Sequence, residues 1–133
     1  MKPSLRVLLI DDTPEIAELL SFALRDRGYE VVAVGFDPGV GDLIAAHRPD
    51  ALVLDCTSYD MAEMLFDAVR ANADGAALPI VIVSDTPEKA DASLRRREAE
   101  RVLLIPKPFT GGQIARALSQ LLNQSPVTNP SNP

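Results

Sequence analysis

The sequence predicts an α/β fold in which helices cover a parallel β-sheet. Short apolar runs, of the length expected for buried strands, alternate with segments of helical periodicity. Four of these runs end at polar groups that can hold a metal ion or a phosphoryl group. They are Asp11 and Asp12 after residues 7–10, Asp55 after 51–54, Ser84 after 80–83, and Lys107 after 102–106. Since ligands of open α/β sheets bind beyond the carboxyl ends of the strands, we expect these groups to meet in one crevice.

Length, composition and charge restrict the class of protein. The 133 residues suffice for one domain with a single core, and a 47% hydrophobic content is enough for a globular fold. A net charge of -6 argues against sequence-independent binding to nucleic acid. The apolar runs are too short to cross a bilayer, and a single cysteine permits no internal disulfide. We therefore expect a cytoplasmic protein that binds neither membrane nor nucleic acid directly.

A helix is predicted directly after the first strand. Thr13 can serve as its N-cap, and Pro14 is favoured at the first helical position. Gly28 is typical of the end of a helix. Between these limits, apolar side chains recur at helical spacing at Ile16, Leu19, Leu20, Ala23 and Leu24.

Strands and helices continue to alternate, which requires parallel pairing through right-handed crossovers. Further strands are predicted over residues 31–34, 51–54, 80–83 and 102–105, and further helices over 40–47, 61–73, 88–100 and 113–123. Residues 37–39 are typical of a turn. The inner faces of the helices over 61–73 and 113–123 are expected to present Leu65, Ala68 and Val69, and Ile114, Leu118 and Leu121. The helix over 88–100 has few apolar residues, so mobility or docking elsewhere is a hypothesis for it.

The composition changes after Asn123 to a segment rich in Pro, Ser and Asn. Such a segment cannot bury enough apolar surface to order itself. Residues 1–123 are therefore predicted to form the domain, and residues 124–133 a disordered C-terminal tail.

The candidate site combines three carboxylates with an ammonium and a hydroxyl group. Repulsion among Asp11, Asp12 and Asp55 would raise at least one pKa, and a hard divalent cation such as Mg²⁺ would relieve it. An aspartate beside Mg²⁺ can attack phosphorus to form an acyl phosphate. Lys107 would bind phosphate oxygens, and Ser84 would donate a hydrogen bond to them. The structural alternatives are helix capping by the aspartate pair, a loop hydroxyl at Ser84 and a solvated turn at Lys107.

Residues 5–123 resemble the receiver domain of two-component response regulators. The resemblance rests on residues 8–12, 52–55, 81–84 and 106–109, which read LLIDD, LVLD, VIVS and PKPF. It implies a flavodoxin-like three-layer (βα)5 sandwich with a five-stranded parallel sheet in the order 2-1-3-4-5.

The resemblance also implies a role for each site residue. Asp55 would be the phosphoacceptor, Ser84 the switch hydroxyl that moves toward the phosphoryl group, and Lys107 a contact to that group. The implied protein ligands of Mg²⁺ are Asp12 directly, Asp11 through water, the phosphoacceptor Asp55 and the backbone carbonyl of Thr57. The Lys107–Pro108 peptide bond is expected to be cis.

The predicted function is phosphoacceptor signalling, in which Asp55 receives a phosphoryl group from a sensor histidine kinase or a histidine phosphotransfer protein. The added charge of roughly -1.5 to -2 would shift a two-state surface toward one partner. Output would reach another protein through the face formed by residues 88–100, 102–105 and 113–123. The chain would assist its own phosphorylation and dephosphorylation without being an enzyme. Thr57 and Thr86 occupy positions that tune the lifetime of the phosphorylated state in the family.

Several positions depart from the family pattern. Tyr59 stands where the family usually has a proline, and Met61 and Ala62 stand where a glycine usually follows. Asp85 stands in place of a small residue, and Leu104 in place of the aromatic switch residue. Residues 99–101 stand where a Gly-Ala turn commonly precedes the fifth strand. Asp85 can crowd or repel a phosphodonor, and Leu104 cannot perform the usual aromatic rotation. We therefore expect phosphorylation with atypical coupling to the output surface.

Two rival functions stay open from the sequence. The first is a degenerate receiver that acts as a phosphorylation-independent interaction module. The second is a phosphohydrolase working through an aspartyl phosphate, although Thr57 stands where such enzymes carry a second carboxylate. A flavin carrier is a weaker alternative because no Gly/Ser/Thr-rich phosphate loop follows the first strand.

Three other features have plainer interpretations. Cys56 is predicted to lie in the core. His47 is interpreted as neither a metal ligand nor a phosphodonor. The basic run Arg95, Arg96 and Arg97 is interpreted as a solvated last helical turn, with a docking patch as the alternative.

Overall fold

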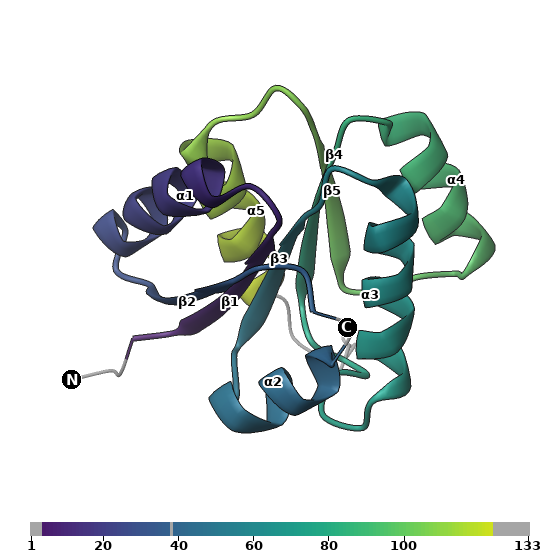
Figure 1. Ribbon diagram of the computed structural model, residues 1–133, viewed down its shortest axis with the longest axis horizontal. Coiled ribbons are helices and arrows are strands. Elements are labelled where there is room, and N and C mark those ends of the chain that lie inside the picture. The colour runs from purple at the N-terminus through teal and green to yellow at the C-terminus, as the bar shows by residue number, and fades with distance from the viewer. Residues whose placement is uncertain (1–3, 38, 124–133) are drawn as a thin grey trace, which may run out of the picture.

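The computed structural model describes residues 4–37 and 39–123, in which five parallel strands alternate with five helices (Figure 1). In chain order the elements are β1 (Arg6–Asp11), α1 (Pro14–Asp26), β2 (Glu30–Val34), α2 (Val40–His47), β3 (Ala51–Asp55), α3 (Tyr59–Ala71), β4 (Ile80–Ser84), α4 (Pro87–Arg96), β5 (Val102–Pro106) and α5 (Gly111–Leu122). The sheet order is β2-β1-β3-β4-β5, which confirms the predicted flavodoxin-like topology. The predicted disordered tail, residues 124–133, lies outside the described residues, as does Pro38 of the predicted turn.

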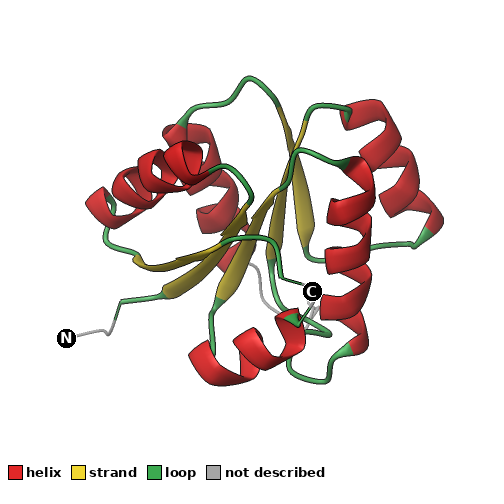
Figure 2. Cartoon of the chain, viewed as in Figure 1, coloured by secondary structure: helices red, strands yellow, loops and turns green. Residues whose placement is uncertain are grey.

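Helices cover both faces of the sheet and form two separate cores (Figures 1 and 2). Helices α1 and α5 pack on one face, and α2, α3 and α4 pack on the other. Alternate residues of β1 serve the two cores, since Val7 and Leu9 face α1 and α5 while Leu8 and Ile10 face the opposite side. Within the described residues, no helix combines the length and apolar character needed to cross a bilayer.

The inner strands carry unbroken apolar runs because both of their faces are covered. Residues 51–54 of β3 are fully buried, as are residues 7–10 of β1. The predicted helix contacts of α5 are confirmed, with Ile114, Leu118 and Leu121 all buried. In α3 the buried residues are Leu65, Phe66 and Val69, and Ala68 packs against the same core while partly exposed, so the predicted inner face is confirmed and Phe66 is added to it.

Helix α4 ends earlier than predicted. It stops at Arg96 rather than at residue 100, because Glu98 adopts a left-handed conformation with φ 47°. The Glu98 N–H donates to the Arg95 carbonyl and the Ala99 N–H to the Leu94 carbonyl, which closes the last turn. Helix α3, in turn, begins at Tyr59 instead of residue 61, with the Ser58 hydroxyl accepting from the Met61 N–H.

Helix α1 begins and ends where the sequence indicated, but its apolar pattern is misleading at one position. Pro14 is its first residue, and Gly28 has a φ of 94° just beyond its end. Thr13 occupies the N-cap position without a side-chain capping bond. Leu19, expected within the apolar pattern, is 65% exposed beside the equally exposed Phe22. Leu20 and Leu24 alone supply the fully buried apolar contacts of this helix.

The packing between α1 and α5 predicts that two adjacent glycines differ in their tolerance of an alanine substitution. A Cβ at Gly111 would lie 2.6 Å from the Ala23 Cβ, whereas the nearest atom to a Cβ at Gly112 is Arg27 Nη2 at 3.4 Å. Gly111→Ala is expected to lower the free energy of unfolding by about 1–3 kcal/mol, because the helices must separate. Gly112→Ala, the matched control, should raise it by up to about 1 kcal/mol through helix propensity. Urea unfolding of both variants measures these changes. Equal changes in the free energy of unfolding for the two variants would contradict the prediction.

Candidate functional site

The carboxyl ends of the parallel strands bring the predicted acids together. Asp11 is the last residue of β1 and Asp55 the last of β3, and the two are direct partners in the register of these neighbouring strands. Their exposed fractions are only 3% and 2%. One oxygen of each carboxylate, Oδ2 in both cases, is buried without a hydrogen-bond partner. Two buried carboxylates with unsatisfied oxygens on neighbouring strands are costly unless a cation or a proton neutralises them.

The buried environment changes the protonation equilibrium of the Asp11 carboxyl group. Burial raises its pKa to about 7, and the nearby Asp55 charge acts in the same direction, although the Thr13 N–H donates to Asp11 Oδ1 at 2.9 Å. The sequence-based expectation that crowded carboxylates would raise at least one pKa is met at this residue.

Asp12 lies in the loop after β1 and binds the loop after β3. Its Oδ2 accepts from the Thr57 hydroxyl at 2.6 Å and from the Thr57 N–H at 3.1 Å. Burial works against its ionisation, but the Thr57 hydrogen bonds hold the pKa of Asp12 below its ordinary value. In the described part of the chain, no group of three carboxylate, imidazole or thiol side chains is arranged to hold a metal ion, and the Asp12 carboxylate is instead hydrogen-bonded to Thr57.

Lys107 supplies the cation of the site. Its Nζ lies 2.9 Å from Asp55 Oδ1 and 3.6 Å from Asp85 Oδ2. Burial acts to lower the pKa of Lys107, but Asp55 and Asp85 outweigh it and raise the pKa above the ordinary value. The Lys107 N–H donates to the Ser84 carbonyl at 2.9 Å, and the following Lys107–Pro108 peptide bond is cis, as predicted. The ammonium group is thus tied to the ends of both β3 and β4.

Ser84 ends β4 beside these groups and is nearly buried. Its hydroxyl accepts a hydrogen bond from the Thr86 N–H at 2.9 Å, a local turn that fixes its orientation. The structure therefore places Ser84 at the predicted edge of the sheet, with its hydroxyl engaged by Thr86.

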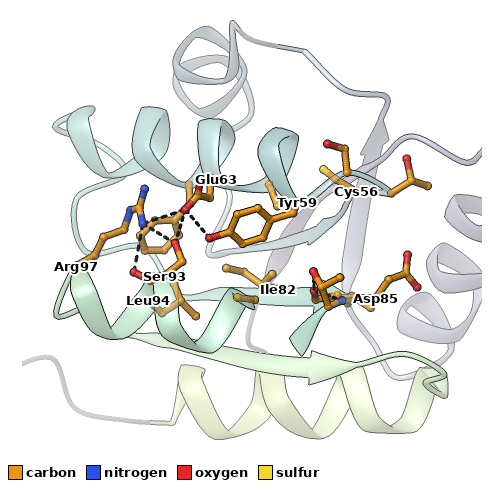
Figure 3. A pocket seen from close by; sticks show the side chains of 16 residues that line it. Cys56, Tyr59, Glu63, Ile82, Asp85, Ser93, Leu94 and Arg97 are labelled. Atoms are coloured by element: carbon orange, nitrogen blue, oxygen red, sulfur yellow. Dashed lines mark hydrogen bonds and ion pairs between the residues drawn. The ribbon is translucent and has the colours of Figure 1, made fainter. Parts of the chain in front are cut away.

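A pocket between α3 and α4 opens beside Ser84 and was not predicted from the sequence (Figure 3). Its empty volume is about 560 Å³, part of it continuous with solvent. The Tyr59 hydroxyl donates to Glu63 Oε2 at 2.8 Å, and the Ser93 hydroxyl donates to the same oxygen at 2.5 Å. Arg97 then contacts Glu63 and binds both oxygens of Asp67, at 2.8 and 3.0 Å.

This network corrects the interpretation of the basic run. Arg97 is not a solvated residue, since its side chain is 28% exposed and joins α4 to α3. The hydrogen bonds to Asp67 raise the pKa of the Arg97 guanidinium further above its already high value. Arg95 and Arg96 fit the original interpretation better, because both remain largely exposed. The acids Glu63 and Asp67, four residues apart on one helix face, were a signal that sequence reasoning could have used.

Cys56 lies in the core, as predicted. It is buried on the side of the sheet that faces α3, and burial together with the charges of Asp12 and Asp55 raises its thiol pKa to about 12. A thiol with so high a pKa is a poor nucleophile.

Comparisons with known proteins agree with this geometry. No protein-family model matches the chain. The probable transcriptional regulatory protein TcrX of Mycobacterium tuberculosis is 29% identical over 123 residues, which make up 92% of this chain and 51% of TcrX. A protein-glutamate methylesterase/protein-glutamine glutaminase of Syntrophotalea carbinolica is 33% identical over 127 residues, covering 93% of this chain and 35% of the relative. The chain therefore spans about half, or less, of the curated relatives it matches.

A solved structure provides the match in architecture. The receiver domain of the sensor histidine kinase PA1611 from Pseudomonas aeruginosa PAO1, with a magnesium ion coordinated in its active site cleft, superposes with a TM-score of 0.74. The identity is 23%, over 91% of this chain and 99% of that domain. The chain therefore has the fold of a receiver domain. The two curated relatives differ in their named activities, since one is a probable transcriptional regulatory protein and the other a methylesterase and glutaminase.

The raised pKa of Asp11 predicts how the stability of the chain depends on pH when no divalent cation is bound. Its pKa is about 7 in the folded chain against an ordinary value of 3.8, so the folded state holds the proton between these pH values and the unfolded state does not. Stability should therefore fall as pH rises from about 4 through 7. Asp11→Asn should remove this decline and raise the free energy of unfolding at pH 8 by about 1–3 kcal/mol.

Urea unfolding from pH 4 to 8 in the presence of a chelator measures this effect. Asp74→Asn is a suitable control, because Asp74 is exposed and its carboxylate has no bonding partner in the described residues. A wild-type decline that persists in Asp11→Asn would contradict the assignment.

Proposed function

We propose that this receiver domain accepts a phosphoryl group on Asp55 with the help of Mg²⁺. The observation that carries the proposal is the environment of the Asp55 carboxylate. One oxygen is paired with Lys107 at 2.9 Å, and the other is buried without a partner, as is one oxygen of Asp11 on the neighbouring strand. A nucleophile, a cation for phosphate oxygens and a place for a metal ion are thus adjacent.

The transfer itself requires little from the protein beyond positioning. An Asp55 oxygen forms a bond to phosphorus while the bond from phosphorus to the donor's imidazole nitrogen breaks, with its electron pair leaving on nitrogen. Lys107 neutralises charge on the phosphoryl oxygens. Ser84 exchanges its Thr86 hydrogen bond for one to the phosphoryl group, which displaces the β4–α4 loop.

The residues present fit a Mg²⁺ ion. The donor set comprises the carboxylates of Asp11, Asp12 and Asp55 together with the backbone carbonyl of Thr57, all oxygen ligands of the type that Mg²⁺ prefers. The unpartnered oxygens of Asp11 and Asp55 have room for new interactions, whereas Asp12 would leave its Thr57 hydrogen bonds. When bound, the ion supplies charge neutralisation for the carboxylates and the phosphoryl oxygens.

The proposed donor is a sensor histidine kinase or a histidine phosphotransfer protein in the cytoplasm, and the proposed output surface is the face of α4, β5 and α5. Leu104 of β5 is partly buried against the α3 and α4 side of the sheet, so it packs where a switch aromatic would move. Coupling is then expected to run through the β4–α4 loop and the Tyr59–Glu63–Ser93–Arg97 network instead.

A second candidate is a phosphorylation-independent interaction module. The observation that favours it is the pairing of Lys107 with Asp85, which engages the ammonium group that a phosphoryl group would need. This alternative would be supported if the folded chain binds a partner but is not phosphorylated.

Intact-mass measurement with acetyl phosphate and Mg²⁺ tests the proposed function. The wild type should gain one phosphoryl group, and Asp55→Asn should gain none, because the amide is not a nucleophile toward phosphorus. Asp60→Asn, which removes an exposed charge from the first turn of α3, should be phosphorylated like the wild type. An adduct that persists on Asp55→Asn, or its absence from the wild type, would contradict the proposal.

A further inference from the structure

Lys107 is shared between two carboxylates of different character. Asp55 is 2% exposed and lies 2.9 Å from the ammonium group, whereas Asp85 is 57% exposed and lies 3.6 Å away. Asp85 directly follows Ser84 and stands in the loop before α4, at the Ser84 end of the pocket between α3 and α4 (Figure 3). One anion thus faces the interior of the site and the other faces solvent at its opening.

The two carboxylates affect Lys107 in the same direction. Both lie within ion-pair distance of the same ammonium group, so both stabilise its positive charge. A phosphoryl group on Asp55 brings additional anionic oxygens that need the same cation. Asp85 therefore competes with the phosphoryl group for Lys107 and adds negative charge where an anionic donor must enter.

We propose that Asp85 is a specificity-determining residue, which makes Asp55 poorly reactive toward small anionic phosphodonors and leaves phosphorylation to donors that dock as proteins. This inference rests on the proposed phosphoacceptor function of Asp55. With acetyl phosphate, an Asp55 oxygen bonds to phosphorus as the phosphorus–oxygen bond to the acetyl group breaks, and its electron pair leaves on acetate. The small donor meets the repulsion of Asp85 with no other contacts to offset it. A docked protein gains binding energy from surfaces outside the site.

The exposure of Asp85 limits the size of the effect. A charge pair at this distance is screened by water on the open side, so removing the charge should change the rate by about three- to tenfold, not by orders of magnitude. The effect should also weaken with salt, because the screening length falls from about 10 Å at 0.1 M ionic strength to about 3 Å at 1 M.

The test compares initial rates of phosphorylation by acetyl phosphate at saturating Mg²⁺ for the wild type, Asp85→Asn and Glu88→Gln. Glu88 is the matched control, since it is exposed in the first turn of α4 and pairs with no cation in the described residues. Asp85→Asn should react about three- to tenfold faster than the wild type at low salt, and the ratio should approach one as salt rises. Glu88→Gln should match the wild type. Asp85→Ser provides a second neutral variant if the amide alters the loop.

Each other outcome overturns the inference in a recognisable way. Equal rates for wild type and both Asp85 variants would leave Asp55 a phosphoacceptor but remove the role of Asp85. Acceleration that is independent of salt would assign the effect to steric crowding, and slower variants would make Asp85 a supporting residue for transfer. No adduct on any variant would overturn the proposed function itself, and the role of Asp85 with it.

Discussion

The ion pair between Lys107 and Asp55 is the interaction on which the site depends. Two carboxylates, Asp11 and Asp55, are buried on adjoining strands in register, and each keeps an oxygen without a hydrogen bond in the described structure. Burying charges without partners is strongly unfavourable, and one ammonium group offsets only part of that cost. This edge of the sheet is therefore short of positive charge, which is the property that a site for a divalent cation requires.

The fold explains how this excess of negative charge is maintained. The central position of β3 buries Asp55 from both faces, and the Lys107 N–H bond to the Ser84 carbonyl fixes the cation against β4. In the pocket that Ser84 also lines, the network from Tyr59 to Arg97 joins α4 to α3 (Figure 3). The β4–α4 loop thus lies between the charged site and an anchored helix pair, so a change at Ser84 has a direct mechanical path to α4.

Patterns along the sequence accounted for the strands, most helix boundaries and the edge of the sheet where the polar groups meet, because these depend on local periodicity and parallel topology. The end of α4 was missed, since Arg97, Glu98 and Glu100 favour helix locally while the left-handed Glu98 turn ends it. The exposure of Leu19 depends on the precise rotation of α1 over the sheet. The Asp12–Thr57 and Arg97–Asp67 contacts join distant segments; the spacing of Glu63 and Asp67 indicates an acidic helix face, but it does not identify Arg97 as the partner.

The central claim is that the edge of the sheet carrying Asp11 and Asp55 is short of a cation. Calorimetric titration with Mg²⁺ tests this claim most directly. The wild type should bind one Mg²⁺ ion at millimolar or lower concentration, and Asp12→Asn should bind it about tenfold more weakly or worse, because a carboxylate ligand is lost. Asp60→Asn, with the same loss of charge outside the site, should bind as the wild type does. Absence of saturable binding, or equal binding by all three proteins, would contradict the account.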